Sequence, residues 1–367
     1  MRKVLLPLAI IVGLFAVTIS NAQITTPRTP SPAAEVKQTL GISTITINYS
    51  RPAVRGREIW GALVPYGYNN LGFGTATAAP WRAGANENTT ITFSDDAKVE
   101  GKSIPAGTYA LFIGVHEDGK ADIIFSKNST SWGSFFYDQK EDQLRVQVQS
   151  EEHAMTERLT YNFVDLTKNS ATVALDWEKK RFPFKVEYDV DAIVLNNARN
   201  QLRNATGFSF QGPLSAANYC AQNQINQEEG IKWADQAIAA NPNFGGYFAK
   251  ARLLEQLGKN DEAITNYDKA VELANKPQLN FMGYQMMGKN KNEKALEYFK
   301  LNVKRNPKDA NVHDSLGECY KNMGNSKAAI KELKTSLSLN PAAGVKANSI
   351  KNLKELGVDT SEYESSK

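Results

Sequence analysis

Cysteine and histidine are scarce in this chain of 367 residues, which contains two cysteines and three histidines. Two cysteines are too few for a disulfide-rich scaffold or a multi-cysteine zinc site. Neither sign of charge dominates, because 43 Lys and Arg residues stand against 39 Asp and Glu residues, so composition gives no argument for nucleic-acid binding. Motifs of phosphate-binding loops, serine hydrolases, zinc proteases and dinucleotide-binding domains are missing. We therefore predict no metal, no cofactor and no catalytic constellation, in a chain long enough for about two domains.

Residues 1–22 have the pattern of a secretory signal peptide. Arg2 and Lys3 precede an apolar run over residues 4–19, which is shorter than the roughly 20 residues that span a bilayer. Small residues before Gln23 predict cleavage near Ala22–Gln23, and residues 23–30 then form a linker. A retained membrane anchor is the alternative. We expect an extracytoplasmic protein, in the periplasm or secreted, with no membrane span after cleavage.

After export, the two cysteines, Cys220 and Cys319, would lie in an oxidising compartment. They lie 99 positions apart, in what are interpreted below as different helical repeats. We therefore expect buried free thiols rather than a disulfide.

Residues 31–190 alternate apolar and polar side chains with the period of a β-strand. Turn signals such as Asp95-Asp96 and Lys168-Asn169-Ser170 separate the runs, and helical periodicity is hard to find. Eight to ten short strands in this span predict an all-β sandwich or jelly-roll-like domain rather than a doubly wound sheet. The clearest alternating runs are Ile45–Tyr49, Tyr109–Val115, Leu144–Val148, Leu159–Phe163, Val173–Trp177 and Phe182–Tyr188.

The second half changes to a spacing of three and four residues. Residues 191–212 predict a connecting helix, with Asp191 as its N-cap, followed by a loop over 207–212. Residues 213–357 repeat, and 358–367 form a polar tail. Small residues that begin successive second helices lie 32 and 34 positions apart. The repeated positions are Ala263, Ala295 and Ala329, the small residues Ala251, Gly283 and Gly317, the bulky residues Tyr267, Phe299 and Leu333, and Pro307 and Pro341.

This pattern follows from the packing of two antiparallel helices. They cross closely only where small residues face each other, bulky residues fill the next turns, and proline ends the second helix. The segment 313–341, HDSLGECYKNMGNSKAAIKELKTSLSLNP, shows it most clearly. The pattern resembles the tetratricopeptide repeat in about four copies. Asn302 departs from it, since it stands where a small apolar residue is usual.

Three blocks in the first half, YSRPAVRGREIWG (49–61), WRAGANENTTITF (81–93) and GKSIPAGTYALF (101–112), resemble the bacterial domain of unknown function 2911 family. The resemblance covers roughly residues 31–190. It implies similarity to secreted proteins of Bacteroidetes-type bacteria that often carry tetratricopeptide repeats, and it implies no agreed biochemical activity. The stretch 67–80 looks like a longer connection than is usual in the family.

Arginine and tryptophan gather in predicted loops of the first half. Arginine forks hold carboxylate or phosphate through two bonds. Trp60, Trp81 and Trp132 are placed to stack on a sugar face, with Asn86 and Glu87 bonding its hydroxyls. Such loops on a sandwich are common binding positions. The alternative is structural, with Arg57 and Arg82 pairing with Glu58 or Glu87; a third reading makes Glu87 a catalytic acid or base. The candidate ligand-binding residues are Arg51, Arg57, Trp81, Arg82, Asn86, Glu87 and Trp132.

In the repeats, Lys250, Asn280 and Tyr284 lie on first helices, the side that lines the concave groove of such arrays. Residues 276–308 also hold eight Lys and Arg residues, which indicate either a solvated face or a surface for an acidic partner. The leading hypothesis is a non-enzymatic interaction or scaffold protein whose repeats bind a protein or peptide. The alternative is a carbohydrate-binding or carbohydrate-active envelope protein that uses the Arg, Trp, Asn and Glu loops.

Overall fold

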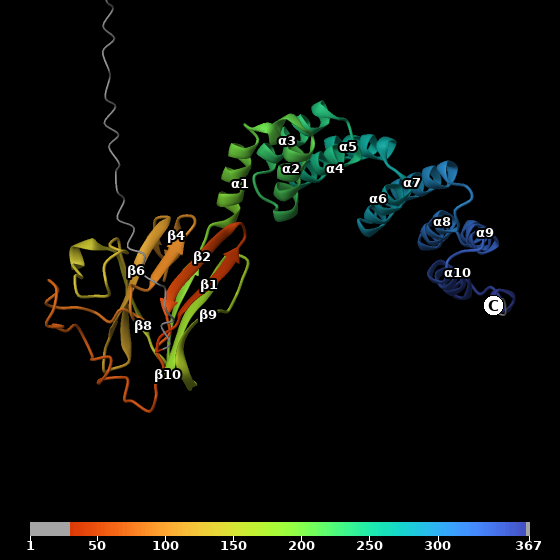
Figure 1. Cartoon of the computed structure of the whole chain (residues 1–367). Helices are drawn as coiled ribbons and strands as arrows, with labels where there is room; N and C mark the ends of the chain where they lie inside the picture. Colours follow the sequence, from red (N-terminus) through yellow and green to blue (C-terminus); the bar gives the residue numbers. More distant parts are fainter. Residues whose placement is uncertain (1–29, 365–367) are drawn as a thin grey trace, which may run out of the picture. The chain divides into compact units, whose positions relative to one another are not determined.

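The computed structural model describes residues 30–364, which form two compact units, one up to Val194 and one from Leu195 (Figure 1). The predicted signal peptide at 1–22 and the linker up to residue 29 lie outside the described residues, as do residues 365–367 of the predicted tail. Among the described residues, no helix is both long and apolar enough to span a bilayer.

The first unit is built from two antiparallel sheets, as the alternating pattern predicts. One sheet has six strands in the order β1-β2-β3-β6-β7-β8, and the other has four in the order β5-β4-β10-β9. The strands are β1 Ala33–Leu40, β2 Ser43–Ser50, β3 Thr90–Phe93, β4 Ala97–Val99, β5 Lys102–Ile104, β6 Gly107–Val115, β7 Lys120–Ser126, β8 Asp142–Gln149, β9 Glu151–Val164 and β10 Ser170–Glu187, with a 3-10 turn η1 at Gln139–Glu141.

Alternate side chains of both sheets meet in one apolar core. Ile45, Ile47 and Phe93 of the six-stranded sheet are fully buried, and so are Leu175 and Phe184 of the four-stranded sheet. The period of two places each apolar set on the inner face, which explains why the sequence pattern predicts this architecture.

Two apolar runs belong to the single strand β10. Leu175 and Trp177 face the core at odd positions, whereas Phe182 and Phe184 face it at even positions. The register with β9 shifts on both sides of Glu178, whose backbone is left-handed with φ 54°. A bulge of this kind reverses which face the following residues present, so both runs reach the core.

The second unit consists of helices. Helix α1, Val190–Gln201, begins at the end of the first unit and continues into the second. Asp189 rather than Asp191 precedes this helix, and its carboxylate accepts from the Ala192 amide at 3.1 Å. The predicted loop at 207–212 contains the end of a 3-10 turn, η2 Ala205–Phe208, and the start of the next helix. The remaining helices are α2 Gln211–Asn223, α3 Gln227–Ala240, α4 Phe244–Gln256, α5 Asn260–Leu273, α6 Lys276–Gly288, α7 Asn292–Arg305, α8 Ala310–Asn322, α9 Ser326–Ser338, α10 Ala343–Glu355 and α11 Ser361–Glu364.

Helices α2 to α9 form four antiparallel pairs, in agreement with the predicted repeat. The small residues stand at the crossings: a β-carbon on Gly317 would lie 2.7 Å from Cγ of Leu333, and one on Gly283 would overlap the ring of Phe299. Cys220 and Cys319 are buried free thiols, as expected, and burial raises the pKa of each to about 11.

Candidate functional site

The loops of the first unit enclose a pocket of about 420 Å³. We call it the arginine–tryptophan pocket and define it by its charged and aromatic lining. Leu63, Asn69 and Leu71 complete one wall, and Ser134 comes from the loop between β7 and β8. Its defining residues are Arg55, Arg57, Trp81, Arg82, Asn86 and Trp177.

Two stacked indole rings form the rigid part of this pocket. The ring centroids of Trp81 and Trp177 are 5.7 Å apart with planes at 17°, and Trp60 packs edge-on against both. Trp81 is fixed by two backbone hydrogen bonds with Ile113 of β6, at 2.9 and 2.8 Å. Trp177 is almost fully buried, and its Nε1 has no hydrogen-bond partner among the described residues. The aromatic surface therefore has a fixed orientation.

Arg82 reaches the pocket without an acidic partner. Its Nη1 donates to the Asn86 carbonyl at 2.7 Å, and its guanidinium lies 5.0 Å from the centroid of the Phe135 ring. Burial lowers the pKa of the Arg82 guanidinium below its usual value. Within residues 30–364 no carboxylate pairs with Arg82, so the predicted alternative of an ion pair with Glu87 is not observed.

The other two arginines differ in how firmly they are held. Arg57 donates from Nε to the Val54 carbonyl at 3.0 Å and from Nη2 to the Ala53 carbonyl, rather than to Glu58. Arg55 is exposed, and its guanidinium has no partner in the described part of the chain. Asn86 donates from Nδ2 to the Ser31 carbonyl at 3.2 Å.

Several residues around the pocket have a strained backbone. Arg55, Ala83 and Asn86 all adopt the left-handed region, with φ of 51°, 50° and 62°. This region costs about 1–2 kcal/mol for a residue with a β-carbon. The Ala83 carbonyl accepts hydrogen bonds from Tyr161 at 2.9 Å and Thr89 at 3.1 Å, which stabilise this conformation. Strain of this kind clusters at functional sites in proteins.

A polar network anchors the loops that supply the pocket walls. Arg145 of β8 donates to the hydroxyls of Tyr68 at 2.7 Å and Tyr137 at 2.6 Å, and to Asp142 at 2.9 Å. Tyr68 donates in turn to Asp122 of β7 at 2.7 Å. Tyr68 precedes the segment that carries Asn69 and Leu71, and Tyr137 follows Ser134, so these bonds tie both walls to the six-stranded sheet.

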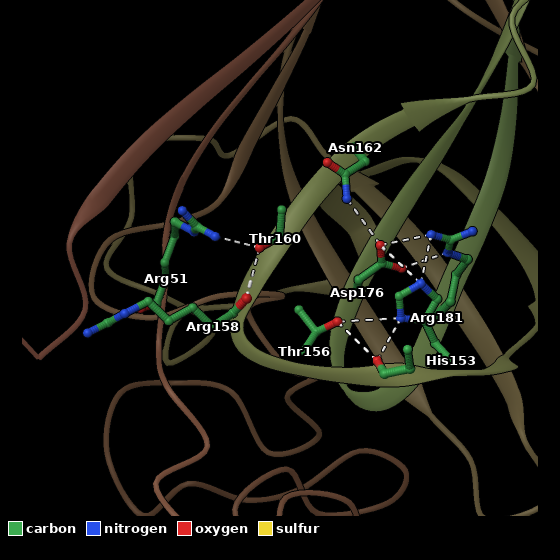
Figure 2. Close-up of polar contacts among 9 residues, drawn as sticks. Arg51, His153, Thr156, Arg158, Thr160, Asn162, Asp176 and Arg181 are labelled. Atoms are coloured by element: carbon green, nitrogen blue, oxygen red, sulfur yellow. Dashed lines mark hydrogen bonds and ion pairs between the residues drawn. The ribbon is translucent and has the colours of Figure 1, made fainter.

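Three of the predicted ligand residues lie outside the pocket lining. Arg51 donates from Nε to the Leu159 carbonyl at 2.9 Å and from Nη2 to Thr160 Oγ1, and so links the segment after β2 to β9 (Figure 2). Glu87 and Trp132 do not line it either, and the Trp132 side chain is 50% exposed. The structure thus brings together Arg57, Trp81, Arg82 and Asn86, and adds Arg55 and Trp177.

A second polar cluster lies on β9 and β10, beside the bulge (Figure 2). The buried Asp176 carboxylate accepts from Arg181 at 2.6 and 2.9 Å and from Asn162 at 3.1 Å. His153 Nδ1 lies 2.9 Å from the Ala154 carbonyl and its Nε2 lies 3.0 Å from Arg181 Nη2. A neutral ring with its proton on Nδ1 satisfies both contacts. No sequence motif marks this cluster, because its members meet only through the irregular register of the two strands.

The predicted partner-binding residues occupy three different environments in the repeats. Lys250 of α4 forms an ion pair with Asp235 of α3 at 2.6 Å. Tyr284 of α6 contacts Ser315 at 3.2 Å and Glu318 of α8 at 2.9 Å. Asn280 of α6 is half-buried, and its Oδ1 is shielded from solvent without a hydrogen-bond partner among the described residues.

Two half-buried aromatic rings and one exposed ring accompany Asn280 on the first helices. The rings of Phe244 and Phe248 stack at 5.5 Å within α4, and Phe248 packs edge-on against Phe281 of α6, also at 5.5 Å. Arg252 lies over the Phe248 ring. Phe281 remains 43% exposed. We call Phe244, Phe248 and Phe281 the phenylalanine patch.

Many basic residues of 276–308 bind neighbouring repeats. Lys276 pairs with Asp309 and Lys289 with Glu255, 33 and 34 positions apart. Arg305 donates to the Val271 and Ala274 carbonyls at 3.3 and 3.2 Å. These contacts recur at one repeat length and connect successive helical pairs. In residues 30–364, no group of three His, Cys, Asp or Glu side chains is placed to hold a metal ion.

Comparison with known families confirms both resemblances. Residues 31–186 match the family described as "Protein of unknown function (DUF2911)", and residues 245–277 and 310–342 match the tetratricopeptide repeat. These repeat segments correspond to α4–α5 and α8–α9. No curated protein matches the chain.

Several solved structures are similar to this chain at low sequence identity. MamA is 15% identical, with a TM-score of 0.30 over 40% of this chain and 86% of its own. YrrB, titled a TPR protein with an unusual peptide-binding site, is 17% identical, with a TM-score of 0.30 over 43% of this chain and 81% of its own. The pilF protein of Pseudomonas aeruginosa is 18% identical, with a TM-score of 0.30 over 41% and 71%. Helical repeats of the matched family present extended surfaces to other proteins, and the array supports a role as a protein-interaction scaffold.

Proposed function

We propose that this chain is an extracytoplasmic, non-enzymatic interaction protein whose repeat array binds a protein or peptide across its first helices. The observation that carries the proposal is the position of Asn280 next to Phe281 on α6. The buried Oδ1 of Asn280 has no donor among the described residues, whereas buried acceptors in proteins are nearly always satisfied. Rotation of the half-buried Asn280 side chain would bring its amide oxygen to the surface, where a backbone N–H of a bound peptide would supply the missing donor.

The phenylalanine patch supports the same surface. Its rings belong to the first helices of successive repeats, α4 and α6, so a partner that crosses both helices would cover them. Aromatic side chains in a desolvated cluster contribute most of the free energy of many protein interfaces. The partner expected from this chemistry is an extended or helical segment with an apolar anchor side chain and free backbone donors beside it.

The proposal is tested by capture from native envelope extract with crosslinking, using the native full chain and three variants of it, Phe281→Ser, Asn280→Ala and the control Leu273→Ser. Phe281→Ser removes a ring that is 43% exposed from a first helix, and Leu273→Ser removes a side chain that is 48% exposed from the second helix α5. A partner retained by the native chain and by Leu273→Ser, but lost from Phe281→Ser and Asn280→Ala, supports the proposal. A partner retained equally by all four proteins, or none retained by the native chain, contradicts it.

The extracytoplasmic location rests on residues 1–22 and needs its own test. The expected result is that the protein in the periplasmic or external fraction begins at Gln23 when its N-terminal peptide is identified by mass spectrometry. A chain that stays in the cytoplasmic fraction with Met1 or Arg2 at its start would contradict this part of the proposal.

A further inference from the structure

We propose that the arginine–tryptophan pocket of the first unit binds a small organic anion with a flat, apolar body. This inference goes beyond the proposed function of the repeats, because it concerns a different unit and a different class of ligand. It rests on the size of the pocket, the charge of its lining and the fixed aromatic surface within it.

The pocket has the dimensions of a small-molecule site. Its volume of about 420 Å³ lies within the roughly 300–1,000 Å³ that such sites occupy. Leu63, Leu71 and Pro80 contribute apolar wall, and Trp81 contributes an indole ring. An inorganic ion would leave most of this apolar surface in contact with water. A ligand with a flat hydrocarbon body fits it better, because aromatic faces stack on such bodies.

The charge of the lining selects an anion. Arg55, Arg57 and Arg82 line the pocket, and among the described residues no Asp or Glu does. Among residues 30–364, no carboxylate pairs with any of these three guanidiniums. Arg55 and Arg57 are exposed, and the Arg82 guanidinium is partly buried. A partly buried cation without a counter-ion is unfavourable, whereas a bound carboxylate would form charge-assisted hydrogen bonds with Arg82.

The donors and the aromatic surface are held in place before a ligand arrives. Arg82 bonds the Asn86 carbonyl and Arg57 bonds two carbonyls of its own loop, so both keep further N–H groups for a ligand. Trp81 is fixed by its stacking on Trp177. The left-handed backbone at Ala83 and Asn86 shapes the segment between these groups. A site that is pre-organised in this way loses little conformational entropy on binding.

The test compares matched anionic and neutral probes on the full chain by calorimetry. The probes are benzoate, 2-naphthoate and indole-3-acetate, each against its own carboxamide, which keeps the flat body and removes the charge. We expect at least one carboxylate to bind, with its amide bound about tenfold more weakly or worse. If no carboxylate binds up to millimolar concentration, or if the amides and carboxylates bind equally, the proposal is wrong.

Variants locate the binding without disturbing the fold. Arg57 and Arg82 bond the backbone and are left intact, whereas Arg55 is exposed and its guanidinium forms no hydrogen bond or ion pair with the described residues. Arg55→Gln and Leu63→Glu should weaken the bound carboxylate severalfold and about tenfold, respectively, because they remove a positive charge and add a negative one at the pocket. Lys98→Gln, on the exposed face of β4, is the matched control. If Arg55→Gln and Leu63→Glu both bind the probe like Lys98→Gln and the native chain, the site lies elsewhere and the assignment is overturned.

Discussion

Gly283 of α6 lies against the ring of Phe299 of α7 so closely that a β-carbon on residue 283 would overlap the ring. The two helices approach at this point because residue 283 has no side chain. The same helix ends with Gly288, around which nothing lies within 4 Å of an added β-carbon. These two glycines therefore separate the effect of close packing from the effect of helix propensity.

Replacing each glycine by alanine should change stability in opposite directions. Gly283→Ala forces α6 and α7 apart and should lower the free energy of unfolding by about 2 kcal/mol, as overpacking typically does. Gly288→Ala meets no neighbour and should raise it by about 0.5 kcal/mol, because alanine restricts the unfolded chain and favours helix. Urea unfolding followed by circular dichroism at the helix band measures both. Equal effects of the two substitutions would contradict the packing derived for this crossing.

The stability of the fold should depend on pH through the buried carboxylate of Asp176. Its burial acts to raise its pKa, but the hydrogen bonds from Arg181 and Asn162 outweigh burial, so the pKa of Asp176 is lowered in the folded state. A carboxyl group with a lowered folded pKa stabilises the fold above its unfolded pKa, near 4, and loses this contribution as the pH falls through the folded value.

We therefore expect Asp176→Asn to cost about 3 kcal/mol of unfolding free energy at pH 7, because it leaves Arg181 without its carboxylate partner. The difference between native chain and variant should shrink as the pH falls below about 4 and through the lowered pKa of folded Asp176, where its carboxylate takes up a proton. Asp118→Asn, at an exposed carboxylate beside Lys120, is the control and should change little. A penalty for Asp176→Asn that does not depend on pH would show that the ion pair is not its cause.

The two buried thiols should react slowly with thiol reagents as long as the chain is folded. Burial raises the pKa of Cys220 and Cys319 to about 11, so only about one thousandth of each is thiolate at pH 8. Neither cysteine should react with a thiol-specific disulfide reagent in the folded chain within minutes, and both should react at once in urea. Rapid labelling of either cysteine without denaturant would contradict its burial.

The sequence predicts most of the packing within the repeats, but it does not predict the contact of Asn302. The small and bulky positions of the helical pairs follow from the spacing alone, because the crossing of two helices fixes which residues must be small. Asn302, which departs from the repeat, is fully buried and donates to the Lys276 carbonyl at 3.1 Å. At this position a hydrogen bond from the Asn302 amide to the first residue of α6 takes the place of the apolar contact that is usual in the repeat. The contact depends on a neighbouring helix and therefore cannot be predicted from the repeat period.

The candidate site of the first unit was only partly predictable. Trp81, Arg82 and Asn86 are near in sequence and meet in the pocket, whereas Trp177 joins them from β10, almost a hundred residues later. Local spacing carries no information on such a contact. Arg51 illustrates the opposite error, since it is close to Arg55 and Arg57 in sequence but binds the backbone of β9. Whether an arginine binds its own backbone or a ligand is decided by the fold.

Binding of a partner across the first helices of the repeats can be followed by hydrogen exchange of the full chain with and without the captured partner. We expect slower exchange on binding in α4 and α6, residues 244–256 and 276–288, with little change in β1 to β10. Slower exchange confined to the first unit, or to the second helices α5 and α7, would contradict it.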